Sequence, residues 1–319
     1  MLKNYRGRFP FKLATTSYIY PDEIVPNIIR LGPFFDEIEL VLFESEKPES
    51  IPDPGVIDRL VELSKLHQVG FNIHLPLDVS LGDERDHVRI HGTSIMKTVM
   101  ERTLPLNPSV YTLHLDFINP PTPFLPRNSV PMSLRGSETT KAISKGIRNR
   151  EIATLSSFAR NDKKGIKVQS LTEGEEESLQ ERDIEAWQQR VSQSLTEILD
   201  FGIEAKRISI ETLGYPFEWV EDVVKEFGLS ICIDIGHVLT HGYDPRHYLE
   251  TYLPRTSIVH LHGVHNGLDH LGIESLPEPE LDLILSSLRH YHGIVSIEVF
   301  SINELKSSLS ILEEKWIQD

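Results

Sequence analysis

Six short apolar runs of this sequence each contain an ionisable side chain of a kind that binds metal ions, close to the C-terminal end of the run. The interior of a buried strand is normally apolar, because an ionisable group buried without a partner or a metal ion costs several kcal/mol. Six such insertions at the same place predict a ring of strands that presents His, Asp and Glu to one point. The runs are FNIHLP with His74, YTLHLD with His114, ISIET with Glu211, ICIDIGH with Asp234 and His237, VHLHG with His262, and SIEVF with Glu298.

The residues around these ligands follow the alternation of a β-strand. Two positions before each ligand the side chain is polar or small, and the residue between the two is aliphatic. Side chains of a strand point to opposite faces with a period of two, so one face is expected to line a barrel lumen and the other to pack against helices. The lumen set is Asn72, Thr112, Ser209, Cys232, His260 and Ser296, and the aliphatic set is Ile73, Leu113, Ile210, Ile233, Leu261 and Ile297.

Strand-like and helix-like segments alternate along nearly the whole chain. Eight βα units predict a parallel sheet, and eight such units close naturally into a (β/α)8 TIM barrel, which is an α/β fold. A doubly wound open sheet is the alternative, but no Gly-rich phosphate-binding turn follows the first strand. The predicted strands are Phe11–Ser17, Asp36–Phe43, Gly70–Leu75, Val110–Phe117, Arg207–Thr212, Leu229–Ile235, Ser257–Gly263 and Ile294–Phe300, and the predicted helices span residues 21–31, 54–67, 84–102, 183–201, 216–227, 244–253, 278–291 and 301–315.

One stretch breaks this rhythm. Residues 118–182 begin with a cluster of prolines, continue with many Ser, Lys and Arg residues, and contain an acidic run at Glu173–Glu177. The sequence therefore predicts a single barrel domain over residues 1–319 with a long polar insertion after the fourth strand. We expect this insertion to be either a solvated, disordered segment or a basic lid that meets a phosphate or another anion.

The composition narrows the class of protein. The 319 residues include 48 acidic and 32 basic side chains, for a formal net charge of −16. This balance argues against sequence-independent binding of nucleic acid, which depends on Lys and Arg. The single cysteine, Cys232, excludes a disulfide within the chain and fits a reducing cytoplasm.

No apolar run approaches the ~18 residues of a membrane-spanning helix, and the first residues do not resemble a signal peptide. We expect a cytoplasmic protein with a small-molecule substrate; the sequence leaves the oligomeric state open.

Imidazole and carboxylate groups without thiolate suit Zn(II), and also Mn(II) or Fe(II). Clustered carboxylates repel one another unless a cation lies between them, so the crowding itself favours metal. Glu211 could bridge two ions, and we expect two or three ions per chain. Candidate catalytic residues are Glu211, Asp234 and Glu298, and candidate ligands are His74, His114, Glu211, Asp234, His237, His262, Asp269, His270 and Glu298.

Further polar residues are candidates for an outer layer of this site. Asp116, Glu39 and Glu44 are expected either to accept hydrogen bonds from the ligating imidazoles or to contact substrate. His260 is expected to line the lumen or to contact a ligand, and His265 is an alternative to His270 as an outer ligand.

The eight βα units, and the order His, His, Glu, Asp-x-x-His, His, Glu along them, resemble the xylose-isomerase-like barrel superfamily. This superfamily includes sugar isomerases and epimerases and the endonuclease IV type of AP endonuclease. The resemblance covers nearly all of the chain except residues 118–182. It implies that Glu211, Asp234, His262 and Glu298 correspond to the ligands of the epimerases. The endonuclease-like branch adds ligands similar to His74, His114 and His237 and a late Asp-x-His; here Asp269-His270 lacks the spacer, which leaves a third metal site open.

Within that branch, four segments resemble the cobamide-remodelling phosphodiesterases: TTSYIYPDEIVPNI, DEIELVLFES, NIHLPLD and HLHGVHNGLDHLGI. This resemblance implies metal-dependent hydrolysis of the phosphodiester in the nucleotide loop of a cobamide. Three alternatives remain. A sugar isomerase or epimerase would use one metal, with Glu211 and Glu298 exchanging a proton. An AP endonuclease is opposed by the net charge, and a corrinoid- or metal-binding module would bind without turnover.

Overall fold

The computed structural model describes residues 2–43, 45, 51–117 and 173–317, without the side chains of 173–180 and 317. Residues 1–120 and 184–319 form one compact unit, and residues 121–183 are grouped apart from it. Most of the predicted insertion and the candidate Glu44 therefore lie outside the described residues. The barrel and the predicted ligands belong to the large unit.

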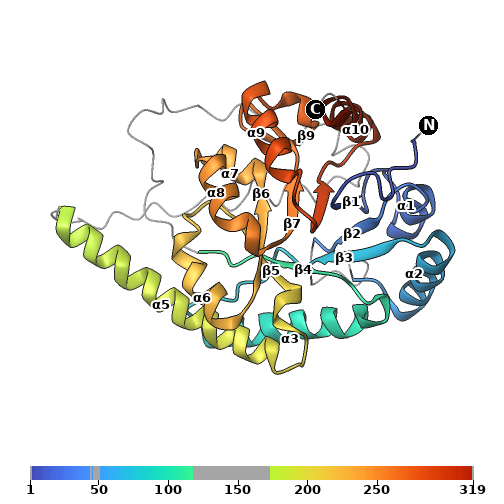
Figure 1. Cartoon of the computed structure of the whole chain (residues 1–319). Coiled ribbons are helices and arrows are strands. Elements are labelled where there is room, and N and C mark those ends of the chain that lie inside the picture. The colour runs from blue at the N-terminus through green and yellow to red at the C-terminus, as the bar shows by residue number, and fades with distance from the viewer. Residues whose placement is uncertain (1, 44, 46–50, 118–172, 318–319) are drawn as a thin grey trace. The chain divides into compact units, whose positions relative to one another are not determined.

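Eight parallel strands form a closed barrel in the order β1-β10-β7-β6-β5-β4-β3-β2 (Figure 1). This confirms the predicted (β/α)8 fold, and each predicted strand overlaps an observed one. Both faces of such strands are buried, and the lumen set and the aliphatic set are fully buried alike. The strands are β1 (Lys12–Thr16), β2 (Glu37–Val41), β3 (Gly70–His74), β4 (Tyr111–Leu113), β5 (Ile208–Glu211), β6 (Ser230–Asp234), β7 (Thr256–Leu261) and β10 (Ile294–Ile297).

Helices follow the strands and pack around the barrel. Asp53 shows how the sequence starts one of them: its carboxylate accepts the backbone N–H of Val56 at 2.9 Å, and Pro54 occupies the first helical position. Gly228 ends another with a φ of 65°. The helices are α1 (Ile24–Leu31), α2 (Pro54–His67), α3 (Asp86–Thr103), α5 (Glu173–Leu199), α6 (Glu218–Phe227), α7 (Ile235–Thr240), α8 (Pro245–Tyr252), α9 (Glu278–Leu288) and α10 (Ile302–Ile317), with short 3-10 helices η1 (Leu104–Leu106), η3 (Ala205–Arg207), η4 (Leu253–Arg255) and η5 (Ile273–Ser275).

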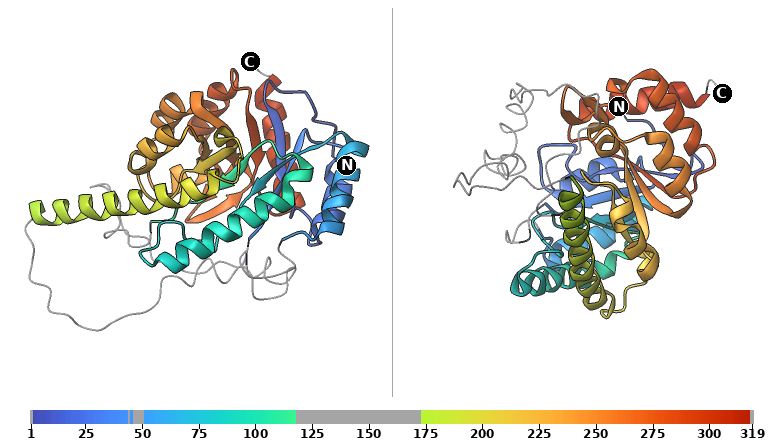
Figure 2. Two further views of the ribbon diagram at one scale, coloured as in Figure 1. Left: turned by 90° about the horizontal axis from the view of Figure 1, so that it is seen from below. Right: turned by 90° about the vertical axis from the view of Figure 1, so that its left-hand side faces the viewer.

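Helix α5 begins at Glu173, earlier than the helix predicted from residue 183, so the end of the predicted insertion is helical. From Ile184 on, α5 lies beside α3 (Figure 2), and Thr93 of α3 donates to Glu197 at 2.9 Å. Trp187, on this helix, is buried and packs against Phe117.

The segment after β7 forms an antiparallel hairpin of β8 (Gly263–His265) and β9 (Leu268–Leu271). Its two turn residues, Asn266 and Gly267, have φ values of 51° and 76°, as a type I′ turn requires. Beyond Gly263, where the predicted strand Ser257–Gly263 ends, no strand is predicted for this segment from the sequence. Asn-Gly between short apolar segments is the signal that indicates such a hairpin.

Among the described helices, none has the length and apolar character needed to cross a membrane.

The segment between β3 and α3 is held by a buried carboxylate. Asp83 accepts hydrogen bonds from the backbone N–H of Arg85 at 2.8 Å and from its guanidinium at 2.9 and 2.8 Å. The hydrogen bond from this guanidinium lowers the pKa of Asp83 from 3.8 to about 2.

This depressed pKa predicts a pH-dependent contribution to stability. Because the folded pKa is below the unfolded value, Asp83 stabilises the fold fully above about pH 4 and loses this contribution as the pH falls towards 2. Asp83→Asn should therefore lower the free energy of unfolding at pH 6, and its difference from the unsubstituted protein should shrink between pH 4 and pH 2. Urea unfolding at several pH values measures this; a difference that does not change with pH would contradict it.

Candidate metal centre

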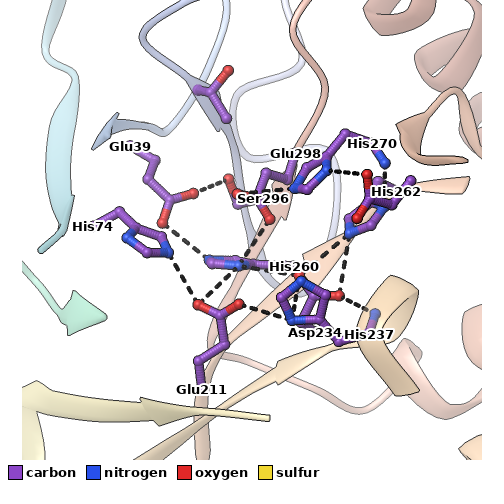
Figure 3. Close-up of polar contacts among 12 residues, drawn as sticks. Glu39, His74, Glu211, Asp234, His237, His260, His262, His270, Ser296 and Glu298 are labelled. Carbon is purple, nitrogen blue, oxygen red and sulfur yellow. Dashed lines mark hydrogen bonds and ion pairs between the residues drawn. The ribbon is translucent and has the colours of Figure 1, made fainter. Parts of the chain in front are cut away.

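The ligand residues predicted on the strands meet at the C-terminal face of the barrel, which is where the ends of parallel strands converge (Figure 3). Three of them are the last residues of their strands, and three follow directly after a strand. The first three are His74 on β3, Glu211 on β5 and Asp234 on β6, and the others are His114 after β4, His262 after β7 and Glu298 after β10.

One group, the histidine group, consists of His74, His114 and Glu211. The Nε2 atoms of both histidines lie 3.0 Å from the same carboxylate oxygen, Glu211 Oε2. His74 Nδ1 lies 3.1 Å from the carbonyl oxygen of Leu75 and donates to it, which fixes the ring with Nε2 towards Glu211. These three residues offer ligand atoms close enough to share one metal ion.

A second group, the three-carboxylate group, surrounds His260. His260 Nδ1 lies 3.0 Å from Glu298 Oε2, 3.7 Å from Asp234 Oδ2 and 3.8 Å from Glu211 Oε2. His260 is fully buried, and Figure 3 shows it between these carboxylates. The sequence pattern predicts His262 as the ligand from β7 and His260 as a lumen residue or ligand contact. The structure instead places a nitrogen of His260 at the point that the three carboxylates share.

The other nitrogen of His260 is held by Glu39, one of the predicted outer residues. Glu39 Oε1 accepts from His260 Nε2 at 3.0 Å, and Glu39 Oε2 accepts from Ser296 Oγ at 2.6 Å. When the ring carries its single proton on Nε2, Nδ1 would present its lone pair to a cation held among the carboxylates. A carboxylate behind a ligating histidine sets the tautomer and orientation of the ring in this way.

Replacing Glu39 by glutamine should therefore weaken metal binding. We expect the dissociation constant to rise about 10–100-fold, which is typical for loss of a carboxylate behind a ligating histidine. Competition with a chelator measures this. Glu37→Gln is the matched control: Glu37 lies on the same strand and bonds Lys12, Asn72 and Ser109 instead of an imidazole. Equal losses of affinity in the two variants would contradict the assigned role.

The spacing Asp-x-x-His has a local cause. Asp234 is the N-cap of α7, and its Oδ1 accepts the backbone N–H of His237 at 2.7 Å. The first turn of α7 thereby carries the His237 ring into the site, with Nδ1 3.0 Å from the carbonyl oxygen of Thr212 and 3.2 Å from Glu211 Oε1. Helix α7 is not among the helices predicted from the sequence.

The hairpin β8–β9 brings the remaining predicted ligands to the site. His270 Nδ1 lies 3.1 Å from Asp269 Oδ1, and His270 Nε2 lies 3.7 Å from Glu298 Oε1. The rings of His262 and His270 are stacked with centroids 4.3 Å apart. His262, His270 and Glu298 also offer ligand atoms within reach of a common ion.

The charges of the site are strongly coupled. Burial alone would raise the pKa of Glu211, but the imidazoles of His114 and His260 hold it well below its ordinary value. Burial would likewise lower the pKa of His237, but the carboxylates of Asp234 and Glu211 raise it to about 10. The pKa values of Asp234 and Glu298 are lowered as well, so these two carboxylates and Glu211 are ionised at neutral pH, and positive charge between them would be stabilising.

A divalent cation fits these residues. Three buried polar atoms of the site have no hydrogen-bond partner: His114 Nε2, His260 Nδ1 and Glu298 Oε2. Each lies close to a carboxylate or an imidazole of the site, so a cation between them would satisfy atoms that hydrogen bonding leaves unsatisfied. The donor set, imidazole and carboxylate, is one that Zn(II), Mn(II) and Fe(II) accept.

The other predicted residues have different surroundings. Asp116 is partly buried next to the histidine group; burial raises its pKa, an effect that His114 opposes and Glu211 reinforces. His265 is exposed on the hairpin. The residue whose central place is not predicted from the sequence is His260, although a signal was available: it is the one imidazole in a lumen set otherwise made of Asn, Thr, Ser and Cys.

The fold is shared with solved structures. A D-tagatose 3-epimerase-like protein matches with a TM-score of 0.65 and 20% sequence identity, over 96% of this chain and 97% of that one. Endonuclease IV from Thermus thermophilus matches with a TM-score of 0.60 and 13% identity, over 97% and 100% of the two chains. A xylose isomerase domain protein from Planctomyces limnophilus matches with a TM-score of 0.57 and 13% identity, over 98% and 97%. This chain has the xylose-isomerase-like fold.

The likeness to the xylose-isomerase-like fold confirms the broader resemblance seen in the sequence. No protein-family model matches the chain, and a search of curated proteins gives no match either. The names of the three structures concern sugar epimerization, xylose isomerization and an endonuclease. None of these names concerns cobamide remodelling, so the narrower resemblance stays a prediction.

Proposed function

We propose that this protein is a divalent-metal-dependent hydrolase of phosphodiesters. The observation that carries this proposal is that Glu211 belongs to two ligand groups at once. Its Oε2 lies 3.0 Å from the Nε2 atoms of His74 and His114 and 3.8 Å from His260 Nδ1. A one-metal isomerase has no need for the histidine group, whereas two neighbouring ions suit displacement at phosphorus.

The histidine group would hold one ion and the three-carboxylate group a second, with Glu211 shared between them. Divalent ions bound there supply Lewis acidity, which polarises the phosphoryl group and lowers the pKa of water. Glu298 or Asp234 would orient the attacking water and take its proton while the water oxygen bonds to phosphorus. The bond from phosphorus to the leaving alcohol oxygen then breaks, and the proton returns to that oxygen.

We propose the nucleotide loop of a cobamide as the substrate. The support is the resemblance of four segments to the cobamide-remodelling phosphodiesterases, three of which, DEIELVLFES, NIHLPLD and HLHGVHNGLDHLGI, contain site residues. The formal charge of −16 argues against a DNA duplex, because phosphate contacts with DNA depend on Lys and Arg. Zinc is the expected ion, with manganese or iron as alternatives.

The test is incubation of the protein, loaded in turn with Zn, Mn, Fe and Co, with a cobamide, an activated phosphate diester and an abasic DNA duplex. Release of the lower-base riboside from the cobamide supports the substrate. Hydrolysis of the activated diester alone keeps the reaction class and rejects the cobamide. Cleavage of the duplex at physiological salt would assign the endonuclease alternative, and binding of the cobamide without turnover would assign a binding module.

A sugar isomerase or epimerase is the second candidate, and the structural likeness favours it. Glu211 and Glu298 both face His260 Nδ1, so two carboxylates approach one point, as proton exchange next to a carbonyl requires. Incubation with ketohexoses in D2O tests this function. Deuterium incorporated next to the carbonyl, with about one metal equivalent per chain, would replace the hydrolase proposal.

A further inference from the structure

The two ring nitrogens of His262 link it to two different parts of the site. The backbone N–H of His270, on β9, donates to His262 Nδ1 at 2.9 Å. His262 Nε2 lies 3.1 and 3.3 Å from the two carboxylate oxygens of Asp234. The ring is fully buried, so these partners are not exchanged for water.

These contacts fix the tautomer of His262. A backbone N–H only donates, so the Nδ1 that receives it carries no proton. The single ring proton of the neutral imidazole is then on Nε2, where it is donated to Asp234. The opposite tautomer would bond the carbonyl oxygen of Gly263 at the longer distance of 3.3 Å and would set two N–H groups against each other at 2.9 Å. Neither nitrogen of His262 then has a lone pair available for a metal ion.

The surroundings hold the ring in this orientation. A Cβ atom at position 236 would lie 1.8 Å from His262 Cε1, so the ring occupies space that only a glycine at this position leaves open. The ring also stacks on His270 with an interplanar angle of 8°. His270 has a φ of 53°, a conformation that a non-glycine residue adopts only where the surrounding structure enforces it.

We propose that His262 is a positioning residue that ties the hairpin β8–β9 to Asp234, and not a metal ligand. The three-carboxylate group already receives its imidazole nitrogen from His260. His262 instead sets where Asp234 presents its carboxylate and where the hairpin carries His270 and Asp269. The part concerning metal rests on the proposed function, whereas the link to the hairpin does not.

Two variants separate the two hydrogen bonds. Asparagine places an amide near the position of Nδ1, so His262→Asn keeps an acceptor for the His270 N–H and loses the donor to Asp234. Glutamine places its amide near the position of Nε2, so His262→Gln keeps the donor and loses the acceptor. His290→Gln, at an exposed histidine outside the site, is the matched control.

We expect opposite responses. His262→Asn should raise the metal dissociation constant about 10–100-fold, with unchanged metal stoichiometry and an unchanged exchange rate of the His270 amide. His262→Gln should leave the dissociation constant within about threefold and speed exchange of that amide on the order of fivefold in the metal-free protein. Nitrogen NMR of the zinc-loaded protein should show the His262 proton on Nε2.

A metal-bound nitrogen of His262, or loss of one metal equivalent in both variants, would overturn the proposal. Unchanged exchange of the His270 amide in His262→Gln would overturn the link to the hairpin. If the unsubstituted protein binds no metal, the proposed function fails, while the exchange measurement still decides whether His262 holds the hairpin.

Discussion

Glu211→Gln should lower phosphodiester hydrolysis about 10³-fold, which corresponds to ~4 kcal/mol of transition-state stabilisation. The variant keeps the shape of the side chain and removes the charge that both ligand groups share. Glu211 Oε2 faces the Nε2 atoms of His74 and His114, and Oε1 lies 3.2 Å from His237 Nδ1. One substitution should therefore weaken both metal positions. Elemental analysis after dialysis should show less than one equivalent of metal per chain, and the rate measurement should show the loss at saturating substrate.

The same substitution at Glu250 serves as the control, because this residue is exposed on α8, away from the site, and 3.6 Å from Arg246. Glu250→Gln should retain activity and metal content. If Glu211→Gln retained two equivalents of metal and a rate within about tenfold of the unsubstituted protein, Glu211 would not be a shared ligand, and the two-ion arrangement would be wrong.

Removing the histidine group with His74→Ala and His114→Ala together should convert a two-ion site into a one-ion site. The three-carboxylate group keeps Glu211, Asp234, Glu298 and His260, so about one equivalent of metal should remain bound. Hydrolysis should fall on the order of 10²–10³-fold, because one of the two ions that stabilise charge on the phosphoryl oxygens is lost. Metal titration and steady-state kinetics on the same preparation measure both effects.

This double variant also separates the two candidate functions. A one-metal epimerase would lose little activity, because its ion would lie among the carboxylates. Retained epimerization of a ketohexose, together with absence of diester hydrolysis, would decide for the second candidate. His290→Ala and His292→Ala, at two exposed histidines before β10, provide a control with the same change in composition.

Much of the fold was predictable because the barrel repeats one unit. Each strand is a short apolar run, and each predicted strand overlaps the observed one. The side chains that face the barrel lumen were also predictable. Because strand side chains alternate with a period of two, Asn72 and His74 lie on one face, and so do Ser209 and Glu211. The position of α7 was not, because a six-residue helix is too short to show the periodicity of a helix face.

The place of His260 among the three carboxylates depended on information that a single strand does not contain. His260 and His262 are two residues apart, so the period of two assigns both side chains to the same face of the strand. It does not determine how far along the barrel axis each of them lies. Pairing between strands decides this. His260 is the partner of Asp234 on β6 and of Ser296 on β10, whereas His262 lies beyond the end of β7. Strand stagger in a closed barrel arises from strand tilt and shear, which are properties of the whole ring.

Closure of the ring between β1 and β10 has a consequence for folding. Thr15 pairs with Ile297, so the ring is joined by residues nearly a whole chain apart, and contacts of such sequence separation form late and slowly. Glu298 follows β10 directly and enters the site with that strand. We therefore expect a chain emerging from the ribosome to present the histidine group, Asp234 and His260 before Glu298 arrives, so that the three-carboxylate group is completed only when the last barrel strand docks.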